Sequence, residues 1–238
     1  MFSEIRNREG ERLDHSFSEG EGTQLVVIGH GVTANKDREW AVTLAQALHA
    51  QGIASLRFSF SGNGESEGDF RASTPSKEVA DLGAVLDLCG EWNVTYVGHS
   101  MGGAVGVMRA SDDSRVTRLV SLAGMVDTAD FARRKFGELE AGRDCMWEKP
   151  ECPLSQAFLD DMDAVGSVEP LATQIRVPWL LVHGTADSVV PFEESERIAR
   201  KATGAVELFP IEGADHVFSG GAAALMAKRV CAWLATTC

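Results

Sequence analysis

Ser100 stands in surroundings that fit a nucleophilic serine. It is the middle residue of the sequence GHSMG (residues 98–102), which follows an apolar, strand-like run and precedes a segment with helical spacing. A serine on such a sharp turn is held in a strained backbone conformation that exposes its hydroxyl, and side chains at the two flanking glycines would collide there. An incidental glycine-rich turn is the alternative, which the strand–turn–helix setting disfavours. The pattern therefore predicts a nucleophile at Ser100.

A serine hydroxyl needs a base to remove its proton, and His216 is the histidine we expect to do this. It lies between the last strand-like run and the last helix-like segment, at the carboxyl edge of the predicted sheet, where Ser100 also lies. The other histidines sit on a hairpin, an amphipathic helix, two turns and the end of a buried strand, where surface or local packing roles are expected: His15, His49, His30, His99 and His183.

A base of this kind needs a carboxylate that accepts a hydrogen bond from the far ring nitrogen and fixes the tautomer. Asp187 lies in the turn after the penultimate strand-like run, at the same edge of the sheet. Asp215 is the alternative because it adjoins His216, but side chains of sequence neighbours generally point apart. Asp187 is the residue we favour.

The chain also offers two backbone N–H groups for a developing oxyanion. The N–H of Met101 begins a helix directly after Ser100, and the N–H of Val32 follows Gly31 in the sequence GHGVTANKD (residues 29–37). The alternative for Gly31 is a tight turn between strand and helix. The later glycine-rich stretch at residues 60–68 contains Gly-x-Gly, but its third glycine comes too late for a phosphate-binding loop, so we interpret it as a structural loop bordering the site.

Apolar, β-branched runs alternate with helical spacing along the chain, which predicts an α/β fold with right-handed crossovers. Strands are expected at 24–28, 53–60, 94–97, 118–122, 179–183 and 206–211, and helices at 37–51, 77–91, 102–110, 192–202 and 222–235. Residues 3–6 and 13–18 predict an antiparallel hairpin on the sheet edge. Together these give a mostly parallel eight-stranded sheet flanked by helices, in one domain spanning residues 1–238.

Residues 126–175 interrupt this alternation because they contain no strand-like run. A segment of this length within a compact domain predicts structure of its own, and we interpret it as a helical lid inserted between two strands. Its aromatic residues have roughly helical spacing, so they either pack a small cap or form the walls of a pocket for the acyl group: Phe131, Phe136, Trp147 and Phe158.

Composition narrows the function classes. The 238 residues carry a formal net charge of −13, which disfavours nucleic acid and anionic membranes as partners. The five cysteines show neither CxxC pairs nor zinc-ligand spacing; Cys145 and Cys152 are close enough in sequence to pair, but free thiols are favoured. No apolar stretch approaches the about 18 residues of a membrane span, and the charged first residues do not resemble a signal peptide. We expect a cytoplasmic protein with a small-molecule partner and with no metal or cofactor.

Five segments taken together resemble the α/β-hydrolase family: HGVTANKDREW, RFSFSGNGESEGDF, VGHSMGG, VHGTADSVVP and IEGADHVFS. They are most similar to its small esterase branch, which includes bacterial cinnamoyl (feruloyl) esterases. The resemblance covers nearly the whole chain, is weakest over residues 126–175, and implies a triad of Ser100, Asp187 and His216 with an oxyanion hole at Val32 and Met101. One departure is Ser59, where many relatives carry an aspartate; we expect a structural role there.

The resemblance implies a serine carboxylesterase that cleaves small esters, including aryl or cinnamoyl-type ones, through an acyl-enzyme. Because the same triad serves any acyl transfer, a thioesterase or a peptidase of the same fold is the alternative within enzymes. A non-catalytic protein that binds a small ligand is the alternative from another class, and the complete triad disfavours it.

Overall fold

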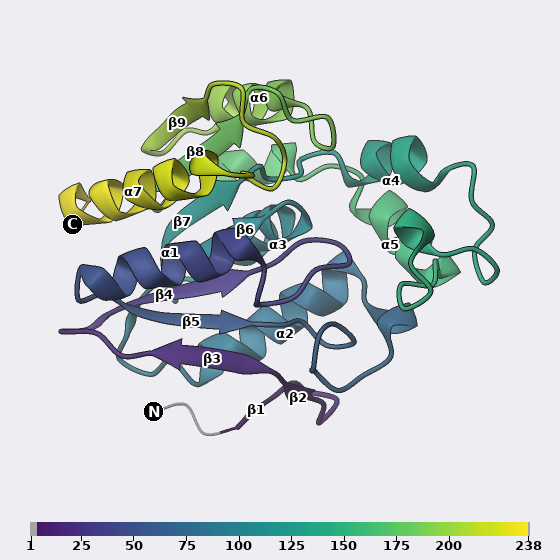
Figure 1. Ribbon diagram of the computed structural model, residues 1–238, viewed down its shortest axis with the longest axis horizontal. Coiled ribbons are helices and arrows are strands. Elements are labelled where there is room, and N and C mark those ends of the chain that lie inside the picture. The colour runs from purple at the N-terminus through teal and green to yellow at the C-terminus, as the bar shows by residue number, and fades with distance from the viewer. Residues whose placement is uncertain (1–3, 238) are drawn as a thin grey trace.

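A twisted seven-stranded sheet forms the centre of the computed structural model, which describes residues 4–237 (Figure 1). The strands follow the order β3-β5-β4-β6-β7-β8-β9; the six from β4 to β9 are parallel, and β3 is antiparallel to β5. Their bounds are β3 (His15–Ser18), β4 (Gln24–Gly29), β5 (Ala54–Phe58), β6 (Asn93–His99), β7 (Val116–Leu122), β8 (Trp179–Gly184) and β9 (Val206–Ile211). The predicted α/β class and mostly parallel sheet are confirmed.

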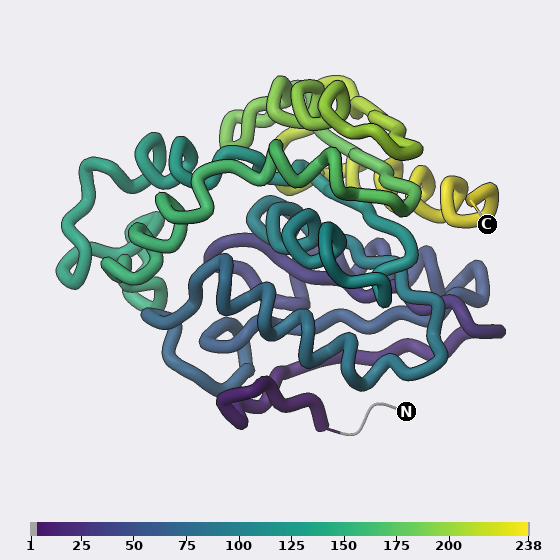
Figure 2. Tube along the Cα trace, turned by 180° about the vertical axis from the view of Figure 1, so that it is seen from behind, coloured from purple at the N-terminus to yellow at the C-terminus, as the bar shows by residue number. Residues whose placement is uncertain are grey.

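Helices cover both faces of the sheet because its central strands are apolar on both sides. In β4, Leu25 and Val27 enter one core, whereas Val26 and Ile28 enter the other. Helices α1 (Glu39–Ala50) and α7 (Gly221–Thr236) lie over one face. Helices α2 (Pro75–Asp87), α3 (Met101–Ala110) and α6 (Phe192–Lys201) lie over the other, which Figure 2 shows from behind.

The expected eighth strand of the sheet is absent from the part of the chain that the structure describes, so that strand count was wrong. Strands β1 (Ile5–Arg6) and β2 (Arg12–Leu13) pair only with each other, and β3 alone joins the sheet. The glycine-rich loop at residues 60–68 explains the break, because the Glu67 N–H donates to the Arg12 carbonyl (2.8 Å) and the Asp14 N–H donates to Ser66 Oγ (2.8 Å). Ser3, the first residue of the expected hairpin, lies outside the described residues.

The segment between β7 and β8 is helical, as expected. It contains α4 (Thr128–Phe136), α5 (Gln156–Val165) and the short 3₁₀ turns η2 (Met146–Glu148) and η3 (Glu169–Gln174); a further turn, η1 (Phe70–Ala72), precedes α2. We call residues 126–175 the insert. In Figures 1 and 2 its helices α4 and α5 project beyond the carboxyl ends of the parallel strands. Among residues 4–237, no helix combines the length and apolar character needed to cross a membrane.

Candidate active site

Ser100 occupies the sharp turn between β6 and α3, at the carboxyl edge of the sheet. Its backbone has φ 54° and ψ −121°, a left-handed conformation that costs about 1–3 kcal/mol for a residue with a side chain. A Cβ added at Gly98 would collide with the backbone of Gly102, and one added at Gly102 would collide with the His30 carbonyl. The glycine spacing in the sequence is therefore what lets the strand, turn and helix pack this closely.

The loop after β4 approaches Ser100 from the opposite side. A Cβ on Gly31 would come within 2.7 Å of the Ser100 Cβ, so only glycine allows this approach. Within residues 4–237, neither the N–H of Val32 nor that of Met101 donates to another protein atom. Both predicted oxyanion donors are therefore unengaged, and Val32 lines the same cavity as Ser100.

The buried His30 holds this loop in place. Its Nδ1–H donates to the Gly31 carbonyl (2.9 Å), and its Nε2 accepts from the Phe60 N–H (3.0 Å). Burial, with a smaller contribution from the charge of Arg38, lowers the pKa of His30 to about 4. The ring is thus neutral near pH 7 and serves as one donor and one acceptor.

The side chain of Asp187 is completely buried and accepts four hydrogen bonds. Oδ2 accepts from Nδ1 of His216 (2.7 Å) and from Nε2 of His183 (3.1 Å), while Oδ1 accepts from the N–H groups of Val189 (2.8 Å) and Val190 (2.9 Å). Burial alone would raise the pKa of this carboxyl, but the hydrogen bonds from the two histidines outweigh it and hold the pKa well below its ordinary value. The group is therefore an ionised acceptor across the physiological range.

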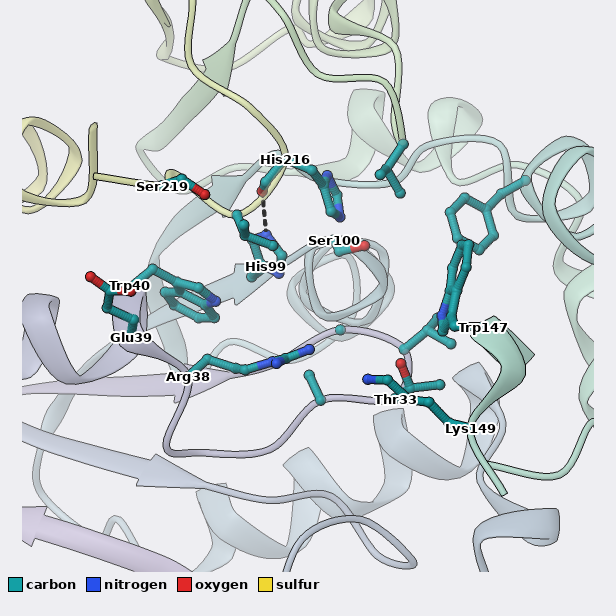
Figure 3. Close-up of a pocket in the computed structure, with 16 residues that line it drawn as sticks. Thr33, Arg38, Glu39, Trp40, His99, Ser100, Trp147, Lys149, His216 and Ser219 are labelled. Carbon is teal, nitrogen blue, oxygen red and sulfur yellow. Dashed lines mark hydrogen bonds between the residues drawn. The ribbon is translucent and has the colours of Figure 1, made fainter. Parts of the chain in front are cut away.

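The tautomer of His216 follows from this contact. A carboxylate can only accept, so Nδ1 of His216 carries a proton, and in the neutral ring this leaves the lone pair on Nε2. The described residues show no direct hydrogen bond between Ser100 and His216, a separation common in unliganded catalytic sites. Both residues line one cavity, into which the Ser100 hydroxyl and the His216 ring project (Figure 3).

Asp215, the alternative carboxylate, has a different task. Its Oδ1 accepts from the Ser219 N–H (2.8 Å), and it makes no contact with the His216 ring among those recorded for the described chain. The structure thus brings Asp187, not the sequence neighbour, to the histidine.

The cavity has a volume of about 380 Å³ and a mostly apolar wall. It is lined by the loop after β4, the start of α1, the Ser100 turn, the insert and the loop that carries His216. None of residues 60–68 is among its lining residues, so the glycine-rich loop supports the site from outside. Within the described residues, no group of three or more histidine, cysteine or acidic side chains is arranged to hold a metal ion.

Comparison with known proteins groups this chain with one large family. The family model described as alpha/beta hydrolase fold matches residues 24–142, which is half of the chain and includes Ser100. The chain belongs to the α/β-hydrolase family.

Individual α/β-hydrolases share the fold over nearly the full chain. Est1E from Butyrivibrio proteoclasticus with ferulic acid bound superposes with a TM-score of 0.87 over 99% of each chain, at 23% identity. Alpha/beta hydrolase domain-containing protein 10 from mouse superposes with a TM-score of 0.83 over 98% of each chain, at 21% identity. The human palmitoyl-protein thioesterase ABHD10, a mitochondrial protein, is 25% identical over 193 residues, which are 74% of this chain and 61% of that protein.

His183 is a residue of this α/β-hydrolase whose importance the sequence reasoning missed. Its Nε2 faces two groups that can only accept, Asp187 and the Val190 carbonyl (3.1 Å each), so Nε2 carries the proton. Nδ1 then accepts from the Ser195 hydroxyl (2.7 Å). His183 therefore anchors the carboxylate that orients His216, and its place four residues before Asp187 was the available signal.

His99 supports the other side of His216. Its Nε2–H donates to the His216 carbonyl (2.8 Å), and its ring packs between the rings of His216 and Trp40, with centroids 4.8 Å from each. Burial, followed by the charge of His216, lowers the pKa of His99 to about 3, so the ring is neutral. A local role was expected for His99, but its hydrogen bond reaches His216, which is 117 residues further along the chain.

The four aromatic residues of the insert separate into two pairs. Phe131 and Trp147 line the cavity. Phe136 and Phe158 do not reach it: both are buried behind the wall, and Phe136 packs edge-on against Trp147 (5.0 Å between centroids) and Phe158 (6.0 Å). Their roughly helical spacing predicted either a packed cap or pocket walls, but it could not show which of the four face the cavity.

Ser59 and the cysteines lie outside the proposed catalytic machinery. Ser59 is fully buried, and its hydroxyl accepts from the Lys36 N–H (3.1 Å), which fits a structural role. Cys145 and Cys152 are free thiols, as are Cys89 and Cys231; Cys238 lies outside the described residues.

Proposed function

We propose that this protein is a serine hydrolase that cleaves small carboxylic esters through an acyl-enzyme. The observation that carries the proposal is the contact between Asp187 and His216 beside a strained Ser100 in one cavity. The family and its esterase and thioesterase relatives support hydrolysis as the reaction class. The ester substrate and the roles of individual residues are our inference.

In the proposed reaction, Nε2 of His216 accepts the proton of Ser100 as Oγ attacks the ester carbonyl. The N–H groups of Val32 and Met101 stabilise the oxyanion, and Asp187 stabilises the imidazolium that forms. His216 then protonates the leaving alcohol, and a water molecule activated by the same histidine releases the acid. His216 performs every proton transfer and the two N–H groups stabilise the oxyanion, so the proposed reaction needs no metal or cofactor.

Thioesters are the second candidate substrate, because the human relative is named a palmitoyl-protein thioesterase. The same residues would perform the same steps with a thiol as leaving group. Measuring kcat/KM on nitrophenyl esters of graded acyl length, aryl esters and acyl-CoA thioesters distinguishes the two classes.

Two further expectations stay proposals. We treat residues 1–238 as one domain with the insert at 126–175. We also propose a cytoplasmic location, although the human thioesterase relative is named as mitochondrial.

Replacing the nucleophile tests the proposed function. Ser100→Ala should abolish labelling by a fluorophosphonate probe and lower kcat by on the order of 10⁴–10⁶. Ser111→Ala is a matched control, because Ser111 lies at the far end of the same helix, where its hydroxyl donates to the Met108 carbonyl. If Ser100→Ala keeps more than about a tenth of the activity, or labelling persists, the nucleophile is misassigned. If the wild type is never labelled and hydrolyses neither esters, thioesters nor peptides, the alternative of a non-catalytic protein that binds a small ligand is favoured.

A further inference from the structure

Two cationic side chains face the cavity in a chain whose formal net charge is −13. Arg38 directly precedes α1, and Lys149 directly follows η2 in the insert. Figure 3 shows the guanidinium of Arg38 and the ammonium of Lys149 pointing from opposite sides into the space below Ser100, with the Thr33 hydroxyl on the Lys149 side of that space. Segments distant in the sequence thus bring two positive charges to the wall that also carries the nucleophile.

Neither charge is neutralised by the protein. Within residues 4–237, no carboxylate forms an ion pair with Arg38 or Lys149. Glu39 is the acidic residue among the cavity-lining side chains, and in Figure 3 its carboxylate points away, past Trp40. Asp187, the carboxylate that contacts His216, is not among the cavity-lining residues, and its two oxygens already accept four hydrogen bonds. The cavity therefore has an excess of positive charge at this wall.

The charges of Arg38 and Lys149 both influence the pKa of the same buried cysteine. Burial raises the pKa of Cys152, and the charges of both Lys149 and Arg38 lower it, so the two cations share a neighbourhood. Burial is the main cause of the lowered pKa values of His30 and His99, and the charge of Arg38 lowers both further. The positive charge of Arg38 therefore influences buried groups of the site, His30 and His99, although Arg38 itself lies at the cavity wall.

We propose that Arg38 and Lys149 form an anion-binding subsite, and that the substrate is an ester that carries a carboxylate or phosphate group besides its ester bond. This inference rests on the proposed function, since it names the substrate class of the same site. A guanidinium offers two parallel N–H donors to such a group, and a lysine ammonium adds a mobile charge. The apolar wall formed by Phe131 and Trp147 lies beside the subsite, so the substrate has an apolar part and an anionic part.

Matched pairs of esters test this directly. One pair is 4-nitrophenyl hydrogen glutarate and its neutral methyl ester, which differ in a charge on the acyl part. A second pair is 4-carboxyphenyl butyrate and its methyl ester, which differ in a charge on the alcohol part. The wild type should show a higher kcat/KM for the anionic member of at least one pair. Inhibition of neutral-ester hydrolysis by inorganic phosphate, compared with monomethyl glutarate, distinguishes a phosphate from a carboxylate preference.

Single variants then assign the preference to the two side chains. Arg38→Gln and Lys149→Gln should each lower the ratio of kcat/KM for the anionic ester to that for the neutral ester by about 5–30-fold, within the range of a charge-assisted hydrogen bond at a partly exposed site. Lys201→Ala, an exposed cation on α6, removes the same unit of charge away from the cavity and should leave the ratio unchanged.

The outcomes separate this inference from the proposed function. If Ser100 is labelled and neutral esters are cleaved, but neither pair shows an anionic preference, the two cations are solvated surface charges and the subsite is wrong. Equal ratios in the wild type and both Gln variants overturn it in the same way. If Ser100 is not labelled and no ester is cleaved, the proposed function fails and the subsite fails with it.

Discussion

At the scale of single residues, the site depends on which nitrogen of each histidine carries a proton. Asp187 receives Nδ1–H of His216 and Nε2–H of His183, which fixes the nitrogen that each ring directs at the carboxylate. When the His216 ring is neutral, its Nε2 is therefore the acceptor, the state that a general base requires. The turn motif, the strand-end positions and the order of Ser100, Asp187 and His216 predicted a triad at one edge of the sheet; the structure brings Asp187 to His216 and places Ser100 and His216 on one cavity, and the catalytic roles stay a prediction. The spacing of four residues between His183 and Asp187 was a signal for the role of His183, but spacing alone does not show that the buried ring points at Asp187.

Comparing an Asn variant of Asp187 with one of Asp215 shows which of the two carboxylates orients His216. Asp187→Asn puts an amide where two histidine N–H groups need an acceptor, so His216 loses its tautomer and kcat should fall by roughly 10³–10⁴. Asp215→Asn should be much milder, because Asp215 accepts from a backbone N–H in an exposed turn. The measurement is kcat on a nitrophenyl ester, with circular dichroism melting to confirm that both variants fold. Reversed severities would overturn the assignment of Asp187.

At the scale of elements, polar contacts attach the insert to the sheet domain at separate places. The buried carboxylate of Glu194 on α6 accepts from the N–H groups of Val126 and Asp127 (2.7 and 3.1 Å), where the insert begins. Asp161 on α5 accepts from the N–H and the hydroxyl of Ser76, at the start of α2 (2.8 Å each). Fixed in this way, the insert holds Phe131 and Trp147 against the cavity.

The insert is where sequence patterns were least informative. Strands and helices elsewhere agree with the expected ranges to within a few residues, because period-two and helical spacing reflect burial against a flat sheet. In the insert, the aromatic residues pack against one another as well as against the sheet domain, so spacing alone did not distinguish the wall residues from Phe136 and Phe158. The missing eighth strand has a related cause, since a distant loop takes the hydrogen bonds at Arg12 and Asp14.

If the insert selects the substrate, its two wall residues should control the ranking of esters. Phe131→Ala and Trp147→Ala should each change the relative kcat/KM of short alkyl, long alkyl and cinnamoyl esters by about 10–200-fold, the range for one pocket contact. Phe136→Leu is the matched control: it changes a buried neighbour of both, so it should lower the melting temperature and leave the ranking intact. A uniform decrease on every ester in both wall variants would mean that the insert stabilises the fold without selecting the substrate.

At the scale of the whole molecule, several ionisable groups are buried in their neutral form, and they connect stability to pH in opposite directions. His99 is fully buried with a pKa lowered by burial to about 3. Glu78 is also buried, and burial together with the charge of Asp81 raises its pKa well above the ordinary value. The Oε2 atom of Glu78 has no hydrogen-bond partner among the described residues. Leaving a buried charged oxygen without a partner is costly, so this arrangement fits a protonated carboxyl better than an ionised one.

The direction of each effect follows from proton counting. Between the unfolded histidine pKa of about 6.5 and the folded value, the unfolded chain binds a proton at His99 that the folded protein does not bind, so stability falls as pH falls. Above the unfolded glutamate pKa of about 4.3, the folded protein keeps a proton on Glu78 that the unfolded chain loses, so stability falls as pH rises. Either group changes the free energy of unfolding by at most about 1.4 kcal/mol per pH unit.

Two amide variants should reveal these opposite slopes. Urea unfolding between pH 4.5 and 8 gives the free energy of unfolding of the wild type, His99→Gln and Glu78→Gln. Below pH 6.5 the wild type should lose stability more steeply than His99→Gln, because the amide has no proton to gain in the unfolded chain. Above pH 5 the wild type should lose stability more steeply than Glu78→Gln, because only the carboxyl ionises on unfolding. Each variant is the control for the other, since a general loss of packing would displace its curve without changing its slope. A wild-type curve parallel to that of either variant would mean that the replaced group titrates alike in the folded and unfolded chains.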